Sequence, residues 1–338
     1  MPESHEVLSM QPAGQSNPFP ARSVMPAWYN SVTQRDLNML DRRLPPEARE
    51  LDTLKKLIKQ CEEMHGPELA AQFDKLRRQI YKAEFLHMTK AIIKKTRILT
   101  EPGLPRIFRE CSKFPWDRKS DSWHLYERWM NEFFDNNILR GIVTKKGVNR
   151  NGDSLDGTYR ISHPRNAKQY GDNGATLGQW WPTQLCAVRD GIHGAPQGGI
   201  HGDKEQGAFS IVLSSGGYRE DEDLGDIIRY SGTAGSGTDS TRVTEAMKKS
   251  FIIKNPVRVL RSSQLPKSNK YRPICGLRYD GLYRVTSCVK TNEETQMYLF
   301  QLERIAGQQP IRFEGESKRP TVHEKRAYDD CKGKGKFD

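Results

Sequence analysis

The chain has 338 residues, of which 35% are hydrophobic, and its formal net charge at pH 7 is +12. The length is sufficient for about two domains, and the low apolar content indicates that part of the chain is disordered. The basic excess favours a polyanionic partner, most often nucleic acid, although a solvated basic surface without such a partner gives the same composition.

The sequence also argues against several classes of protein. It contains six scattered cysteines: Cys61, Cys111, Cys186, Cys275, Cys288 and Cys331. Without a CxxC pair they do not indicate a zinc module or a secreted disulfide framework. Residues 1–34 have no apolar core like that of a signal peptide, and no run approaches membrane-spanning length. We therefore expect an intracellular protein without a membrane partner, a cofactor or a bound metal.

The N-terminal half is predicted to be helical. Residues 1–34 are rich in Pro, Ser and Gln and read as a disordered leader. Residues 35–144 form the expected helical region. Apolar residues recur every three or four positions in one helix and again in a second: Leu51, Leu54, Ile58 and Cys61, then Leu69, Phe73, Leu76 and Ile80. His65–Pro67 breaks the pattern between them.

An aromatic stripe marks the end of this half. Trp123, Tyr126, Trp129 and Phe133 lie close to helical spacing, which is more typical of a core than of a binding face. We expect a small helical bundle or a set of paired helices, without catalytic residues.

The composition changes near residue 145. Residues 145–177 are predicted to be a linker and the entry to a second domain, because Lys145–Gly157 is rich in Gly, Asn and Asp. Strand-like runs follow at Gln184–Arg189, Phe209–Leu213, Val257–Arg261, Leu282–Val289 and Met297–Leu302. Short strands separated by glycine-rich turns indicate a curved sheet or small barrel. Residues 314–338 read as a charged disordered tail.

The strand-rich half carries an ordered set of motifs. These are "GGIHGDKEQGAFSIVLSSGGY" (Gly198–Tyr218), then "DIIRYSG", "NPVRVLRSS" and "NKYRPICGLRYDGLYRV". Together they resemble the SRA (SET- and RING-associated) domain, also called YDG after the signature that Tyr279, Asp280 and Gly281 carry here. The resemblance covers residues 178–313. It implies an α+β fold, a crescent-like β-barrel preceded here by the small all-α region, and a domain that flips modified cytosine out of DNA into a pocket.

The resemblance gives a meaning to "SSGGYREDEDLGDIIRYSG", which we call the acidic stretch (residues 214–232). Tyr218 and Tyr230 match the two aromatics that stack on the flipped base, and stacking contributes ~1–3 kcal/mol per base. Asp221 matches the carboxylate that accepts from the cytosine amino group. Ser231 matches a small hydroxyl residue that holds the base or shapes the pocket around its methyl group.

Three further residues complete the expected base pocket. Ser215, Gly216 and Gly217 match a bare backbone stretch whose amide and carbonyl groups lie close to the base. From local sequence alone, the same stretch is compatible with a solvent-exposed hairpin. Its acids do not have the spacing of a calcium-binding loop, and Glu220, Glu222, Asp223 and Asp226 are expected to be scaffold or solvent-facing.

Two "GIHG" copies precede the stretch, and the second aligns with the family. In that register Gln197 falls on the thumb residue that fills the gap left in the duplex. His193 and His201 are interpreted as turn or scaffold residues, since their spacing does not suggest a zinc pair on a helix. Tyr279 and Asp280 are expected to be structural, with Asp280-Gly281 turning the chain into a strand that begins at Leu282.

One departure from the family follows the second tyrosine. Some members carry a long loop there that checks the opposite strand, whereas Gly232–Ser250 is short and rich in small residues, with Arg242 as the basic side chain of its first half. The preference for hemimethylated sites is therefore in doubt.

Several functions remain open at this point. The favoured one is a nuclear, chromatin-associated, non-enzymatic reader of 5-methylcytosine, or a related modified cytosine, in double-stranded DNA. A modification-dependent nuclease would need a metal-binding carboxylate cluster with a nearby lysine, and "ELDTLKK" (Glu50–Lys56) has the residue types on a helix. The sequence has no Cys/His zinc cluster, which argues against a ubiquitin ligase or a histone methyltransferase. A chromatin scaffold would bind proteins through the helical half.

Overall fold

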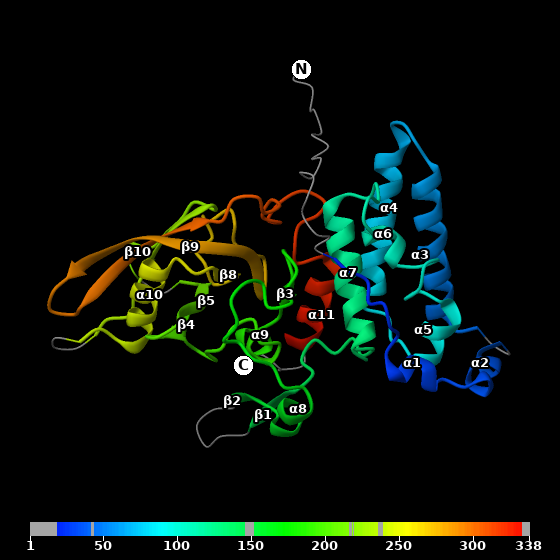
Figure 1. The fold of residues 1–338 in the computed structure, drawn as a ribbon, viewed down its shortest axis with the longest axis horizontal. Helices are drawn as coiled ribbons and strands as arrows, with labels where there is room; N and C mark the ends of the chain where they lie inside the picture. The colour runs from blue at the N-terminus through cyan, green and yellow to red at the C-terminus, as the bar shows by residue number, and fades with distance from the viewer. Residues whose placement is uncertain are drawn as a thin grey trace. The chain divides into compact units, whose positions relative to one another are not determined.

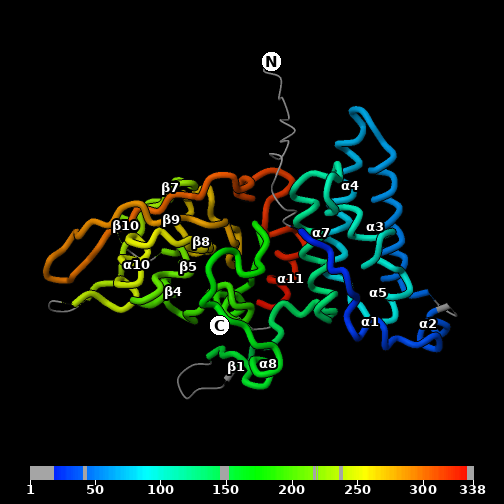
Figure 2. Tube along the Cα trace, in the orientation of Figure 1, coloured from blue at the N-terminus to red at the C-terminus, as the bar shows by residue number. Residues whose placement is uncertain are grey.

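The fold is known from a computed structural model, which describes residues 19–41, 44–145, 152–215, 218, 220–235 and 239–332. The chain divides into two compact units, Met1–Asn136 and Asn137–Asp338. Figures 1 and 2 show helices in the first and a sheet with flanking helices in the second.

The N-terminal unit is all-helical in the described residues. Its helices are α1 (Ala27–Ser31), α2 (Gln34–Asp41), α3 (Pro46–Glu63), α4 (Glu68–Ala83), α5 (Lys90–Thr96), α6 (Pro105–Phe108) and α7 (Trp116–Met130). The apolar faces predicted for α3 and α4 form their contact, with Leu51, Leu54 and Ile58 fully buried. The break predicted at His65–Pro67 lies between the two helices, as expected.

The leader differs from the prediction in its described part. Helix α1 lies within residues 1–34, and its Trp28 is buried in the helical core. The indole nitrogen of Trp28 donates to the carbonyl of Met130, 3.1 Å away. Long-range contacts of this kind order a segment whose composition alone indicates disorder. Residues 1–18 lie outside the described residues.

The C-terminal unit is built on one large sheet. Eight strands of its described residues belong to it: β3 (Trp180–Trp181), β4 (Ile200–Asp203), β5 (Gly207–Leu213), β6 (Glu222–Asp223), β7 (Ile227–Ser231), β8 (Val257–Ser262), β9 (Leu277–Asn292) and β10 (Met297–Arg304). The order is β4-β5-β8-β9-β10-β7-β6, with β3 paired to β9. The pair β5–β8 is parallel, and the other pairs are antiparallel.

Four helices and a small hairpin surround this sheet in the described residues: α8 (Gly157–Ser162), α9 (Gln184–Arg189), α10 (Arg242–Ile253), α11 (Val322–Lys332), and β1 (Ile142–Lys145) paired with β2 (Gly152–Leu155). Helix α10 packs on β4, β5 and β9 (Figure 1). No pairing of β4 with β6 closes the sheet in the described part of the chain. The α+β class is confirmed, and the crescent-like barrel stays a prediction.

Two expectations for this unit were wrong. Gln184–Arg189 is helix α9 rather than a strand, because the Thr183 side chain caps its first turn by accepting from the backbone N–H of Cys186. The segment 314–338 includes α11, whose Glu324 is buried and pairs with Arg319 at 2.8 Å.

The expected linker also contains regular structure. Gly152–Leu155 pairs with Ile142–Lys145, and α8 follows directly. Asp156 begins α8 by accepting from the backbone N–H of Thr158. The turn-forming composition of this region therefore accompanies a hairpin and a capped helix.

Candidate functional site

Strand β7 positions two residues of the predicted pocket, Tyr230 and Ser231. Both are buried, and Tyr230 lies opposite Phe300 of β10. The Tyr230 hydroxyl donates weakly to the carbonyl of Val212 at 3.4 Å. Burial raises the pKa of Tyr230, and Asp221 and Tyr218 raise it further, so the ring is a neutral phenol at physiological pH. Tyr230 is thus a fixed aromatic wall at the edge of the sheet core.

The wall formed by Tyr230 has Gly199 as its neighbour. A Cβ atom at position 199 would lie 2.4 Å from the Tyr230 hydroxyl oxygen and 3.4 Å from the Val212 carbonyl. Only glycine fits here without displacing the tyrosine. Gly199 is the first residue of the second "GIHG" copy. Because it lies against the Tyr230 hydroxyl, this copy is next to the predicted pocket.

Asp221 is the polar centre of the cluster. Its Oδ1 accepts from the backbone N–H of Ser231 at 2.7 Å, and its side chain is half-buried. Burial raises the pKa of Asp221, and the hydrogen bond from Ser231 opposes that rise. Among the described residues Asp221 has no ion pair, so its second carboxylate oxygen is not committed to a cation.

Three of the four neighbouring acids differ from Asp221 because each has an arginine partner. Glu222 pairs with Arg229 at 3.5 Å, and Asp226 with Arg304 at 3.8 Å. Asp223 is nearly inaccessible and pairs with the fully buried Arg261 at 2.6 Å. The prediction that these acids are scaffold or solvent-facing agrees with their contacts. Glu220 is exposed.

The residues before Asp221 are more open. Tyr218 is 38% exposed, and its carbonyl accepts from the N–H of Asp221 at 3.4 Å. Ser215 is also exposed. Gly216 and Gly217 were predicted to approach the base, and both lie outside the described residues. Tyr218, Asp221, Tyr230 and Ser231 are brought together, with one tyrosine buried and the other accessible.

Gln197 lies in a short loop that we call the thumb loop (residues 195–198). Its side chain is exposed, while the backbone around it is held. The Gln184 side chain donates to the carbonyls of Ala195 and Gly198 at 2.7 and 2.8 Å. The expected thumb residue therefore projects from a loop with a fixed base. Gln184 was missed from sequence because its segment was assigned to a strand.

His193 also supports the thumb loop. Its ring is fully buried, with Nδ1 2.8 Å from the Ser210 hydroxyl and Nε2 2.9 Å from the Gly198 carbonyl. Burial lowers the pKa of His193 to about 4. Its contacts agree with the scaffold interpretation.

The signature residues are structural by their contacts. Tyr279 is fully buried and its hydroxyl donates to Asp172. Asp280 is buried between two arginines, Arg261 at 3.0 Å and Arg278 at 2.6 Å. The predicted turn at Asp280-Gly281 is wrong. Strand β9 runs through it with Gly281 at φ +108° beside a register shift against β8, so the glycine permits a bulge.

The connection from β7 to α10 is short, as expected. It extends from Gly232 to Thr241, with residues 236–238 outside the described residues. Thr241 caps α10, and Arg242 is the first residue of that helix, with an exposed side chain. Its position at a helix start ties Arg242 to the scaffold rather than to a loop tip.

The residues proposed for a nuclease are committed elsewhere. Glu50 on α3 pairs with Lys82 of α4 at 2.8 Å, and Asp52 pairs with Lys55 at 2.9 Å. In the described parts of the chain, no three His, Cys, Asp or Glu side chains are grouped as a metal site would require. No helix among the described residues is long and apolar enough to cross a bilayer.

Comparisons with known proteins bear on the domain that the ordered motifs predict. Residues 169–308 match the family model of the SAD/SRA domain. A UHRF1-like protein from Cryptococcus neoformans var. grubii is 36% identical over 36% of this chain and 40% of its own length. The E3 ubiquitin-protein ligase ORTHRUS 2 of Arabidopsis thaliana is 35% identical over 35% of this chain and 20% of its own length.

One solved structure is also similar to this chain in sequence. The SRA domain of SUVH5, crystallised with fully methylated CG DNA, is 30% identical over 43% of this chain and 99% of that chain, with a TM-score of 0.35. The chain spans less than half the length of the two curated relatives above. Residues 169–308, less than half of the chain, thus match the SAD/SRA domain family.

Proposed function

We propose that the C-terminal unit binds double-stranded DNA containing 5-methylcytosine or a related modified cytosine. The base leaves the stack and enters between Tyr218 and Tyr230, with Asp221 at its amino edge. A base inside the duplex hides its Watson–Crick edge, so inspection by a carboxylate requires extrusion. The printed name of the SUVH5 complex, an SRA domain with methylated DNA, supports this choice of ligand.

The single observation that carries the proposal is the state of Asp221. It is half-buried and hydrogen-bonded to the Ser231 backbone, and among the described residues it has no arginine partner of the kind that holds Glu222, Asp223 and Asp226. A half-buried carboxylate without a cation partner is costly unless a further donor arrives. The cytosine N4 amino group is such a donor.

The other parts of the site have separate tasks. Gln197 enters the vacated position in the duplex and hydrogen-bonds to the orphaned partner base. The basic excess of the chain holds phosphates, which fix the protein on the duplex without reading sequence. We propose no catalytic step for this unit. We expect the protein to lie on chromatin in the nucleus and the helical unit to bind protein partners.

A titration tests this function. The full chain is titrated with matched duplexes that are unmodified, hemimethylated or fully methylated at one CG site, and anisotropy is measured. We expect tighter binding of methylated duplexes by about fivefold or more, the effect of ~1 kcal/mol or more from one base-edge contact. Equal affinity for all three duplexes would contradict the proposal. Incubation of the methylated duplex with Mg²⁺ and protein tests the nuclease alternative, for which cleavage is the positive result.

A further inference from the structure

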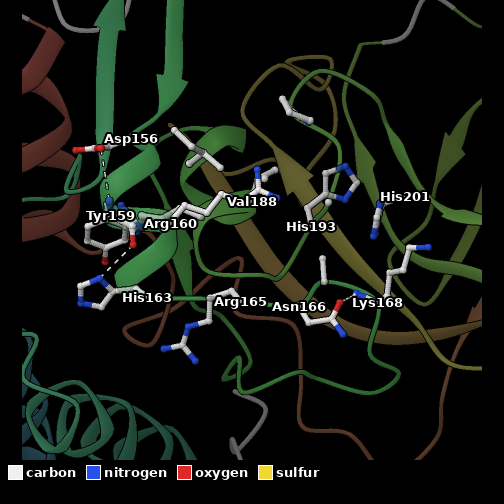
Figure 3. A pocket seen from close by; sticks show the side chains of 15 residues that line it. Asp156, Tyr159, Arg160, His163, Arg165, Asn166, Lys168, Val188, His193 and His201 are labelled. Carbon is white, nitrogen blue, oxygen red and sulfur yellow. Dashed lines mark hydrogen bonds between the residues drawn. The ribbon is translucent and has the colours of Figure 1, made fainter.

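A cavity of about 320 Å³ lies in the C-terminal unit beside the thumb loop. One wall is the segment 155–168, which includes α8, and the other comes from residues 188–201 (Figure 3). His193, Gly194 and Pro196 belong to the second wall, and Gln197 follows directly in the chain. The predicted thumb residue therefore follows directly, in the chain, a residue that lines the cavity.

The first wall lies before the region matched by the family model, which begins at residue 169. The lining is strongly basic, with Arg160, Arg165, Lys168 and Arg189 against a single carboxylate, Asp156. Asp156 is occupied in capping α8. The two walls thus form a positively charged cavity. One of these walls, the segment 155–168, lies outside the region that the family model matches.

The cations of this lining differ in their commitments. Arg189 is paired with Asp190 at 2.7 Å, and Lys168 with Asp203 at 2.8 Å. The Arg160 and Arg165 side chains are exposed, and no hydrogen bond or ion pair of either is present in the described residues. Two guanidinium groups are therefore available to an anion at the cavity mouth.

The part of this wall that follows Arg165 is anchored by hydrogen bonds to buried side chains and to the loop before the thumb. The fully buried Arg258 of β8 donates to the carbonyls of Ala167, Gly171 and Ile192 at 2.8, 2.7 and 2.9 Å. Asn173 donates to the carbonyls of Asn166 and Gly191 at 2.9 and 2.8 Å. These bonds join residues 166–171, which follow Arg165, to residues 191 and 192, which lead to the thumb loop. A charged site on an anchored wall loses little freedom when an anion binds.

We propose that Arg160 and Arg165 bind backbone phosphate of the duplex whose base pair Gln197 enters. Guanidinium forks match phosphate geometry and bind it through two parallel hydrogen bonds. Because Pro196 lines the cavity and Gln197 is its neighbour, a duplex entered by the thumb has its backbone beside this mouth. The contact fixes the register of the thumb on the duplex and reads no base. This inference rests on the proposed function.

The test compares two double variants of the full chain. R160Q/R165Q removes the two mouth charges. K318Q/R326Q removes two exposed charges of the same unit that line no part of this cavity, so both proteins lose the same net charge. Each is titrated with methylated and unmodified duplexes at several salt concentrations. A second series replaces single phosphates near the methylated cytosine by uncharged methylphosphonate.

We expect R160Q/R165Q to bind both duplexes about tenfold more weakly than K318Q/R326Q, with a salt slope shallower by about one to two. Wild-type protein loses affinity when one or two particular phosphates are neutralised, and R160Q/R165Q no longer responds at those positions. Identical behaviour of the two double variants, with wild type still preferring methylated DNA, would overturn this inference alone. Loss of the preference in wild type itself would overturn the proposed function and the inference with it.

Discussion

At the scale of single residues, the family pattern placed Tyr218, Asp221, Tyr230 and Ser231, and the structure gathers them. Their contacts could not be predicted. The hydrogen bond from the Ser231 backbone to Asp221 depends on the register of β7 and on the turn after Tyr218. A sequence with five acids between two tyrosines also does not say which of them pair with arginines and which, among the described residues, do not.

The buried His193 gives a prediction about acid stability. Burial lowers its pKa from 6.5 to about 4 in the folded protein. As pH falls below 6.5, the unfolded chain takes up a proton that the folded ring refuses, so the contribution to stability is lost between pH 6.5 and about 4. Each pH unit corresponds to ~1.4 kcal/mol, which gives about 3 kcal/mol in total.

Urea unfolding at a series of pH values measures this contribution. The free energy of unfolding of wild type should fall more steeply across that window than that of His193→Gln, which keeps hydrogen-bonding groups but does not titrate. Parallel curves for the two proteins would contradict the prediction, because they would mean that His193 takes up its proton at the same pH in the folded and the unfolded state.

At the scale of elements, long periodic helices were predictable and short segments were not. Leu51 to Ile80 gave two amphipathic helices because burial repeats every turn. Gln184–Arg189 is six residues long, and a short apolar run does not distinguish a strand from a capped helix. Helix α11 depends on the Arg319–Glu324 pair and on Tyr328 near Trp180, neither of which composition reveals.

Helix α9 and the thumb loop lead to a second prediction. Gln184→Ala removes two hydrogen bonds to the loop backbone and leaves the Gln197 side chain intact. The loop then becomes more mobile, and ordering it on binding costs affinity. We expect binding of methylated duplex to weaken about three- to tenfold, by the ~1 kcal/mol typical of one or two hydrogen bonds. Gln179→Ala, which also removes a bond to a loop backbone elsewhere in this unit, serves as the control.

The connection between β7 and α10 leads to a third. It spans Gly232 to Thr241, and its basic residue, Arg242, lies in the helix that follows. We expect less than a tenfold preference for hemimethylated over fully methylated duplex in competition titrations. A tenfold preference is about 1.4 kcal/mol and would mean that another element reads the opposite strand.

At the scale of the whole molecule, the net charge of +12 predicts how binding responds to salt. Each phosphate contact releases a counterion, so the logarithm of the association constant falls linearly with the logarithm of salt, with a slope of about −0.9 per contact. Anisotropy titrations of one duplex between low and moderate salt check this. A flat response would indicate that the basic surface makes no phosphate contacts.

Composition favours a polyanionic partner, which stays a proposal, and the ordered motifs predicted the domain that residues 169–308 match, since both signals are spread along the chain. The cavity beside the thumb was not predictable. Its walls join residues 155–168 to residues 188–201 through Arg258 of β8, a contact set that no local pattern records.

The most direct test of the account is the comparison of Asp221→Ala with Glu222→Ala. The full-length variants are titrated with methylated and unmodified duplexes at one salt concentration. Asp221→Ala should lose the methylated-DNA preference, a change of roughly 1–3 kcal/mol, while general DNA binding survives through phosphate contacts. Glu222→Ala should keep the preference, because Glu222 is exposed and pairs only with Arg229 among the described residues. If both variants behave alike, the acidic stretch is a solvated loop and the base pocket does not exist.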